Sequence, residues 1–173
     1  MRLNQRKVPI AQQGFALIEV LTTILVVSFG LIGLAGMGVV GLKNNHMSYY
    51  RSIATQQAYD MSDRMRANLG DTTGGVKGTS SSTNYNSISG PGTNQSCITT
   101  AAGCSYAQLA QYDQYAWNAA NAALLPGGTG TVTGSVSTYF TITVSWTEVC
   151  TSSDPGCNAI GGITRSFATT FWP

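Results

Sequence analysis

Hydrophobic and polar positions divide the chain into an apolar N-terminal stretch and a mixed remainder. Residues 15–42 carry a single charged side chain, that of Glu19. A helix of this length, rising 1.5 Å per residue, extends about 42 Å, whereas the hydrocarbon core of a bilayer is about 30 Å thick. The pattern therefore predicts a helix that spans a membrane.

Polar residues appear after Leu42 without a helix-breaking signal, so the same helix is expected to continue. Its apolar positions then recur at spacings of three and four, which predicts an amphipathic second half. The expected buried stripe comprises Met47, Tyr50, Ile53, Ala54, Gln57, Ala58, Met61, Met65 and Leu69. The Asn-Leu-Gly sequence at 68–70 is a stop signal, and Arg64 and Arg66 suit the negative end of the helix dipole. We expect one helix from Phe15 to about Leu69.

The next two segments differ sharply in composition. Residues 70–96 are rich in Gly, Ser, Thr and Asn, and their buried-type residues are Val76, Tyr85 and Ile88. This composition is typical of a long surface loop or of a disordered linker, and the sequence does not separate the two. Residues 105–125 instead have apolar residues at helical spacing and end before a proline, which predicts a second helix. Its expected stripe comprises Leu109, Tyr112, Ala116, Ala119, Ala120, Ala123 and Leu124.

The C-terminal third predicts a small sheet. Apolar residues alternate strictly with Thr and Ser over 140–146, which is typical of a half-buried strand. Residues 129–136 and 163–172 are weaker strand candidates on either side. The expected fold class is therefore α+β, with a small antiparallel sheet packed on the amphipathic half of the long N-terminal helix.

Charge is scarce, and this narrows the range of functions. Asp, Glu, Lys and Arg make up 9% of the 173 residues, with a formal net charge of +2, against about 25% charged residues in an ordinary domain. No basic face is expected, so nucleic acid is not an expected partner. With one histidine, His46, and no catalytic or nucleotide-binding motif, neither enzymatic activity nor a cofactor is expected. The Gly-Gly-Thr-Gly sequence at 127–130 lacks the lysine of a phosphate-binding loop and is interpreted as a turn.

Four cysteines complete the candidate chemistry: Cys97, Cys104, Cys150 and Cys157. They lack the close C-x-x-C pairs and accompanying histidines of a zinc site, so no metal is expected. An even count in an exported domain predicts disulfides, for which three connectivities are possible. We favour the local pairs Cys97–Cys104 and Cys150–Cys157, because each closes a short loop rich in turn-forming residues.

The residues before the apolar run predict its orientation. Arg2, Arg6 and Lys7 precede it without any acidic residue, which favours a cytoplasmic N-terminus and an extracytoplasmic remainder. A secretory signal also begins with positive charge, but its small-residue cleavage site follows a shorter apolar region. Here the small residue, Gly14, precedes the apolar run.

This arrangement carries a family resemblance. The sequence GFALIEVLTTILVV, with Gly14 before Phe15 and Glu19 at the fifth position of the run, resembles the type IV prepilin signature. The resemblance implies that 1–14 is a leader peptide, removed between Gly14 and Phe15 by a prepilin peptidase that also methylates the new N-terminus at Phe15. It further implies that 15–42 is the transmembrane and assembly half of the helix. Residues 43–173 would be the periplasmic head of a type IV pilin fold, with 70–96 as its αβ-loop.

Glu19 has two interpretations. A carboxylate close to the membrane interface can reach water with its own side chain. In type IV pilins the equivalent glutamate pairs with the N-terminal ammonium of a neighbouring subunit, so the resemblance implies that Glu19 is an assembly residue. The glycines of the run likewise serve either close helix packing or, by the resemblance, a segment that melts in the assembled pilus. They are Gly30, Gly33, Gly36, Gly38 and Gly41.

Two further stretches resemble the PilV-like branch of minor pilins. They are AYDMSDRMRAN at 58–68, and Asp113 with Trp117 followed by LLPGGTGTV at 124–132. Without the resemblance, the charged residues of the first stretch are simply solvated ion pairs along a helix, and Trp117 is a core residue. With it, the chain is expected to be a minor pilin that enters the pilus or its initiation or tip complex and promotes assembly, adhesion and twitching motility.

The resemblance also implies partners and locations. The partners are other minor pilins, the major pilin, the prepilin peptidase, the inner-membrane assembly platform, and membrane lipid before assembly. The locations are the inner membrane, with the C-terminus periplasmic, and the extracellular pilus. One alternative is a minor pseudopilin of a type II secretion system. Another is a tip adhesin or DNA-uptake subunit that binds through the Ser/Thr/Asn-rich loop and exposed aromatic residues such as Tyr85 and Tyr106.

Overall fold

A computed structural model describes residues 17–70, 75–77, 84–99, 101, 103–150, 155–157 and 162–173. Gly14 and Phe15, the expected cleavage and methylation positions, lie outside the described residues. The chain divides into two compact units, Met1–Asn44 and Asn45–Pro173, and each is considered by itself.

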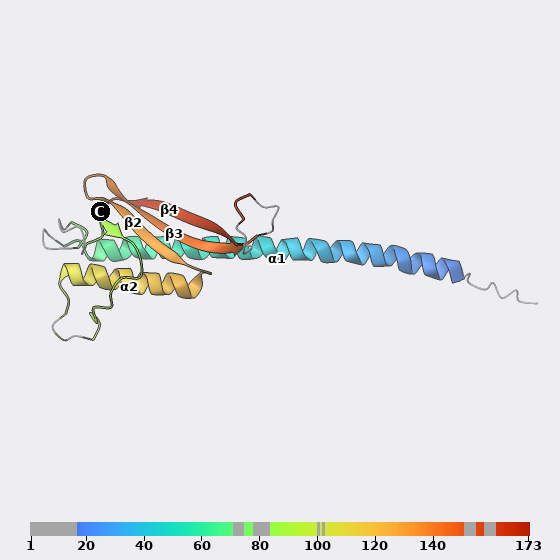
Figure 1. Cartoon of the computed structure of the whole chain (residues 1–173), viewed down its shortest axis with the longest axis horizontal. Coiled ribbons are helices and arrows are strands. Elements are labelled where there is room, and N and C mark those ends of the chain that lie inside the picture. The colour runs from blue at the N-terminus through green and yellow to red at the C-terminus, as the bar shows by residue number, and fades with distance from the viewer. Residues whose placement is uncertain are drawn as a thin grey trace, which may run out of the picture. The chain divides into compact units, whose positions relative to one another are not determined.

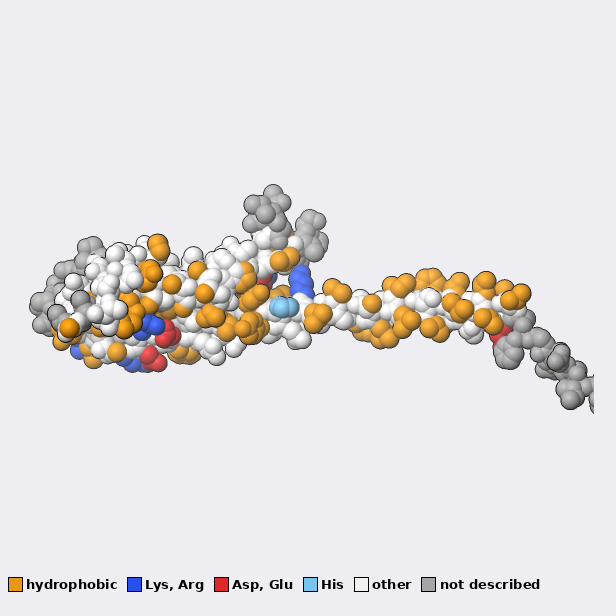
Figure 2. Space-filling model, turned by 90° about the horizontal axis from the view of Figure 1, so that it is seen from below, with side chains coloured by type: hydrophobic (Ala, Val, Ile, Leu, Met, Phe, Trp, Pro, Cys, Tyr) orange, Lys and Arg blue, Asp and Glu red, His pale blue; other side chains and the backbone are white. Residues whose placement is uncertain are grey.

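One helix, α1, spans Leu17–Ala67 and contributes to both units. In the described part of the first unit, residues 17–44, every residue is exposed, and many hydrophobic side chains lie along the face of the helix that Figure 2 shows. The most apolar window has a mean hydropathy of 2.3, and the helix is long and apolar enough to cross a membrane. The expected helix end near Leu69 lies two residues beyond the observed one.

The second unit contains a four-stranded antiparallel sheet with the order β1-β2-β3-β4. Its strands are β1 (Ser87–Ile88), β2 (Thr129–Ser135), β3 (Tyr139–Val149) and β4 (Gly162–Phe171). The alternating segment at 140–146 is the middle of β3, where every second side chain is buried. The two weaker candidates are β2 and β4, each within one residue of the expected bounds.

The region 70–96 is more ordered than a surface loop in its described parts. It supplies strand β1, and its three apolar residues, Val76, Tyr85 and Ile88, are all buried in the core. The expectation of a surface loop or linker is therefore wrong for these residues, which find their apolar partners on other elements rather than on each other.

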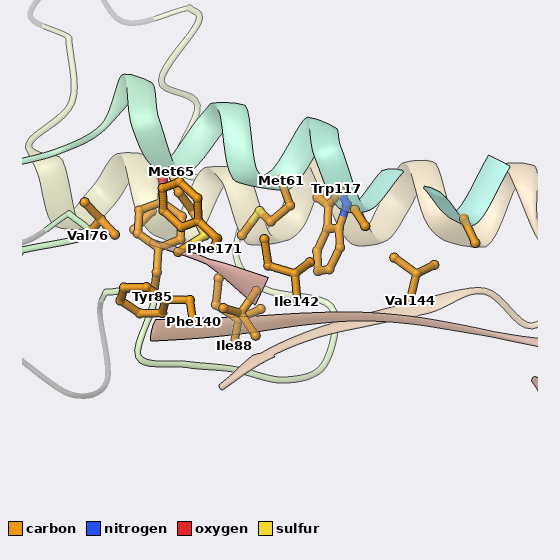
Figure 3. Close-up of a cluster of buried hydrophobic side chains, with 14 of the residues drawn as sticks. Met61, Met65, Val76, Tyr85, Ile88, Trp117, Phe140, Ile142, Val144 and Phe171 are labelled. Carbon is orange, nitrogen blue, oxygen red and sulfur yellow. The ribbon is translucent and has the colours of Figure 1, made fainter. Parts of the chain in front are cut away.

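The core lies between the sheet and the helices on one of its faces (Figures 1 and 3). Ala54, Ala58, Met61 and Met65 of α1 are fully buried against inward-facing residues of the strands, among them Ile142. Each large apolar side chain buried in this way contributes about 1.5–3 kcal/mol. The expected stripe of α1 is thus confirmed along its middle.

The end of the α1 stripe differs from the expectation. Leu69 is 40% exposed, whereas the neighbouring Asn68 is only 1% exposed. The helix ends at Ala67, so the periodicity that placed Leu69 on the buried face no longer applies there. Asn68 takes the buried position, where its Nδ2 donates hydrogen bonds to the Tyr85 hydroxyl and to the backbone carbonyl of Tyr106.

Helix α2 (Tyr106–Leu124) begins at a capping box that the spacing pattern does not reveal. Ser105 accepts a hydrogen bond from the backbone of Gln108, and the Gln108 side chain accepts one from the backbone N–H of Ser105. This reciprocal arrangement satisfies two backbone donors at the helix start. The bounds match the expected helix, but its buried face does not, because the buried residues are Ala110, Asp113, Trp117, Asn118 and Asn121.

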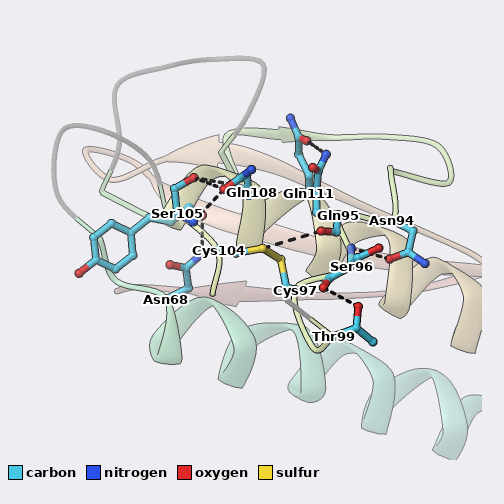
Figure 4. Close-up of a disulfide and its surroundings, with 11 residues drawn as sticks. Asn68, Asn94, Gln95, Ser96, Cys97, Thr99, Cys104, Ser105, Gln108 and Gln111 are labelled. Carbon is cyan, nitrogen blue, oxygen red and sulfur yellow. Dashed lines mark hydrogen bonds between the residues drawn. A yellow bond between two sulfur atoms is a disulfide. The ribbon is translucent and has the colours of Figure 1, made fainter. Parts of the chain in front are cut away.

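Both favoured disulfide pairs are present, Cys97–Cys104 and Cys150–Cys157. Figure 4 shows the first beside the start of α2, where Gln95 donates a hydrogen bond to Gln111. The disulfide therefore holds the segment before α2 close to the helix that follows it.

We expect the double variant Cys97→Ser, Cys104→Ser to lose about 2 kcal/mol of unfolding free energy. A bridge that closes a loop this short restricts the unfolded chain by about that amount. Urea unfolding of the oxidised wild type and of the variant measures the difference. A free energy equal to that of the wild type would contradict a stabilising role for this bridge.

Candidate functional site

The first unit presents an apolar surface interrupted by one carboxylate. Glu19 lies in the first turn of α1 and is exposed. The hydroxyl groups of Thr22, Thr23 and Ser28 all donate hydrogen bonds to backbone carbonyls of the same helix. Because these polar groups are satisfied within the helix, they add little polarity to its surface. If apolar groups surround this part of the helix, the Glu19 carboxylate is therefore the ionisable group that loses contact with water.

The glycines of the apolar segment all lie within α1 and are surrounded by open space. Apart from the adjacent residues and the nearby backbone of its own helix, a Cβ atom added at Gly30, Gly33, Gly36, Gly38 or Gly41 would meet no atom within 4 Å. The fold of the single chain therefore places no steric demand on these positions. Any close approach that the glycines permit is to a neighbouring helix or to lipid.

Four polar residues come together in the second unit and form what we call the Asp113 cluster: Arg64, Asn68, Tyr85 and Asp113. The Tyr85 hydroxyl donates to Asp113 Oδ2, and the Arg64 guanidinium lies 3.3 Å from Asp113 Oδ1. Asn68 Nδ2 donates to the Tyr85 hydroxyl at 3.2 Å and to the backbone carbonyl of Tyr106 at 2.9 Å. The cluster thus links the end of α1 to α2 and to the segment before β1.

Burial dominates the electrostatics of this cluster. Desolvation raises the pKa of the Asp113 carboxyl, while the hydrogen bond from Tyr85 and the charge of Arg64 act in the opposite direction. Desolvation, together with the neighbouring Asp113, also raises the pKa of the Tyr85 hydroxyl. Tyr85 is therefore neutral at physiological pH, and its hydroxyl donates a hydrogen bond to Asp113.

The next turns of α2 make further bonds across the head. Trp117 Nε1 donates to the backbone carbonyl of Gln57 on α1 at 2.8 Å. Asn118 accepts from the backbone N–H of Gly130 at 2.7 Å and donates to the carbonyl of Gly90 at 2.9 Å. A Cβ at Gly130 would overlap the Trp117 ring, so the close approach of β2 to α2 requires glycine there. The sequence at 127–130 is therefore a turn that leads into a strand.

The stretches that resemble PilV-like minor pilins thus supply structural contacts of the head. Arg64 of the first stretch contacts Asp113 of the second across 49 positions of the chain, and Asn68 is connected to Asp113 through the Tyr85 hydroxyl. The simple ion pairs also occur, with Arg64 on Asp60 and Arg66 on Asp63. The spacing of apolar residues alone did not predict that Asp113 is buried. Its position three residues after Ala110 and four before Trp117 places it on the same helix face as these two residues, which could have indicated its burial.

The aromatic residues considered for a binding surface are not equivalent. Tyr85 is fully buried and cannot contact a ligand, so its assignment as an exposed aromatic is wrong. Tyr106, at the start of α2, is 48% exposed. The physical reason for the burial of Tyr85 is its hydrogen bond to Asp113, which satisfies the hydroxyl while the ring fills the core.

Groups suited to catalysis are sparse in the part of the chain that the structure describes. No group of three or more His, Cys, Asp and Glu residues there could hold a metal ion. His46 is exposed and lies beside the ring of Tyr50. A groove of about 470 Å³ between α2 and β2 is lined mainly by Ala, Gly, Thr and Pro residues, with Tyr115 as its one aromatic ring.

Comparisons with known proteins give no further identification: no family model, no curated protein and no solved structure matches this chain.

Proposed function

We propose that this protein is a minor pilin of a type IV pilus, of the PilV-like branch. It is processed by a prepilin peptidase and incorporated into the pilus or its initiation or tip complex, where it promotes assembly. In the membrane it is a single-pass protein with a periplasmic head. Its partners are other minor pilins, the major pilin and the assembly platform.

The observation that carries this proposal is the apolar helix of the first unit. All its described residues, 17–44, are exposed, and one carboxylate, Glu19, lies in the first turn. An exposed apolar surface of this extent is stable only in lipid or against other apolar helices. A subunit that passes from a membrane into a helical bundle of identical or related subunits uses both environments in turn.

The head supports the same proposal. The second half of α1 buries one stripe under an antiparallel sheet, and two disulfides suit an extracytoplasmic compartment. The Asp113 cluster ties α1 to α2, so a load applied along α1 is transmitted to the head through charged and hydrogen-bonded groups as well as through apolar contacts. Such a connection suits a filament subunit.

N-terminal sequencing and intact-mass measurement of the protein from its native host test the proposal. We expect a mature chain that begins at methylated Phe15 and is present both in membranes and in sheared surface fibres. A chain that retains residues 1–14, or one cut after residue 42, contradicts the pilin proposal. A correctly processed chain that is confined to membranes favours the alternative, a minor pseudopilin of a type II secretion system.

A further inference from the structure

The sheet of the head has one face that no described helix covers. Buried side chains of β3 point toward α1 and α2, so the alternate residues of each strand point to the opposite face. We call this surface the threonine face. It comprises Thr129, Thr131 and Thr133 of β2, Thr141, Thr143, Ser145 and Thr147 of β3, and Thr164, Ser166, Ala168 and Thr170 of β4. Thr129 and Thr131 also line the groove between α2 and β2.

The residues of the threonine face form rows across the sheet. Thr141 pairs with Thr133 on one side and with Thr170 on the other, and Ser145 pairs with Thr129 and Ser166 in the same way. Neighbouring strands are about 4.8 Å apart, and alternate residues along a strand about 6.8 Å. Ten of the eleven side chains carry a hydroxyl group and none is charged.

Two exposed aromatic rings lie at one end of this surface. Tyr139, at the start of β3, is 56% exposed, and Trp172, just after β4, is 61% exposed. Their ring centroids are 5.7 Å apart and the ring planes are inclined by 60°. Figure 1 shows that the turn between β2 and β3 and the C-terminus lie at the same end of the sheet. Beside Tyr139, the Ser135 hydroxyl lies within hydrogen-bond distance of those of Ser137 and Thr138.

The backbone of Tyr139 is strained. Its φ angle is +88°, in a region that bulky residues rarely adopt. The backbone N–H of Thr138 donates to the carbonyl of Ser135, so Tyr139 follows a tight turn, at the position where hairpins of this kind usually have glycine. The ring at position 139 is thus present although glycine would suit the turn better, which points to a role for the exposed side chain.

We propose that the Tyr139–Trp172 pair and the adjoining threonine face bind a neutral saccharide. The faces of aromatic rings are electron-rich and attract the C–H-bearing faces of sugar rings. Serine and threonine hydroxyls both donate and accept hydrogen bonds, as sugar hydroxyls do. A charged ligand would find no opposite charge on this face, and a protein partner would find too few apolar side chains for the core of an interface. The proposal does not rest on the pilin assignment.

Isothermal titration with the full chain in lipid nanodiscs tests this inference, since detergents with sugar headgroups would compete. The probes are three neutral hexasaccharides, cellohexaose, chitohexaose and mannohexaose. We expect at least one to bind the wild type, and both Trp172→Ala and Tyr139→Gly to weaken it at least about tenfold. Tyr59→Ala, which removes an exposed ring from α1, is the matched control and should bind as the wild type does.

Thermal unfolding separates loss of the site from loss of the fold. Because glycine adopts a positive φ without strain, Tyr139→Gly should melt at or above the temperature of the wild type while binding less saccharide. Three results would overturn the proposal: no binding of any hexasaccharide at millimolar concentration, unchanged binding in both variants, or an equal loss in Tyr59→Ala. If the variants lose co-purifying pilus proteins while the wild type binds no sugar, the surface is a protein interface instead.

Discussion

Replacing Glu19 by alanine is expected to remove this protein almost completely from sheared fibres while its amount in the membrane stays unchanged. In the proposed filament the Glu19 carboxylate lies among apolar helices and pairs with the N-terminal ammonium of a neighbouring subunit. Removing one partner of a buried ion pair costs about 3–5 kcal/mol, which corresponds to a factor of about 100 or more in the assembly equilibrium. Quantitative immunoblotting of the fibre and membrane fractions measures this.

The helix itself supplies a matched control for Glu19. Thr22 lies one turn further along, is exposed, and its hydroxyl donates to the backbone carbonyl of Glu19. Thr22→Ala should therefore assemble at close to the level of the wild type. Equal amounts of Glu19→Ala and wild-type protein in the fibre fraction would contradict the assembly role. That result would favour the alternative interpretation, in which the carboxylate simply reaches water at the membrane interface.

Replacing Asp113 by alanine is expected to cause a large loss of stability in the head, about 3 kcal/mol. The variant leaves the buried Tyr85 hydroxyl without its acceptor and removes one of the two carboxylates that contact Arg64. Buried polar groups that lose their partner cost about 1–3 kcal/mol, and more when charges are involved. For a domain of this size the melting temperature should fall by about 12 °C. Calorimetry or circular dichroism measures the change.

Two further variants test whether the loss of stability in Asp113→Ala comes from the buried Asp113 cluster. Asp63→Ala removes a carboxylate from the exposed pair with Arg66, and such surface pairs are worth less than about 1 kcal/mol. Tyr85→Phe keeps the buried ring and deletes only the hydroxyl, so it should cost about 1–2 kcal/mol. If Asp113→Ala were as stable as Asp63→Ala, the cluster would not hold the head together.

The raised pKa of Asp113 also determines how its contribution to the unfolding free energy changes with pH. Because burial raises its pKa in the folded state, the folded protein takes up a proton at a pH where the unfolded chain is still ionised. The contribution of Asp113 to the unfolding free energy therefore increases as the pH falls from neutral through the raised value, and levels off below the unfolded value. The difference between wild type and Asp113→Asn, followed by urea unfolding from pH 7 to pH 4, should show this slope. The opposite slope would contradict the direction of the shift.

Local sequence patterns predicted the structure correctly where a single local rule determines it. The alternation at 140–146 lies within strand β3, because a strand with one covered face needs an apolar residue at every second position. The described part of the apolar run, residues 17–42, is helical and exposed, as expected of a segment suited to lipid, where a helix satisfies its own backbone hydrogen bonds. The cysteine spacing also indicated the observed pairs, because short loops bring their ends together at low entropic cost.

The buried face of α2 shows where such patterns fail. Counting apolar residues favoured the face of Leu109 and Tyr112, yet the buried residues include Asp113, Asn118 and Asn121. Hydrogen bonds satisfy Asp113 and Asn118 inside the head, whereas the buried side-chain amide of Asn121 finds no partner among the described residues. The partners of Asp113 and Asn118 lie far away in the sequence: Tyr85 is 28 residues from Asp113, Arg64 is 49, and Gly90 is 28 from Asn118.

The sequence by itself therefore determined the long helix with its apolar half, the main strands and the disulfide pairs. Each of these depends on the periodicity of apolar residues or on residues that are close together in the chain. Only the tertiary structure decided that Tyr85 and Ile88 belong to the core and that Asp113 faces inward. It also decided that Tyr139 and Trp172 stand side by side on an uncharged face. These features depend on which distant segments meet, and no local period of the sequence encodes such a meeting.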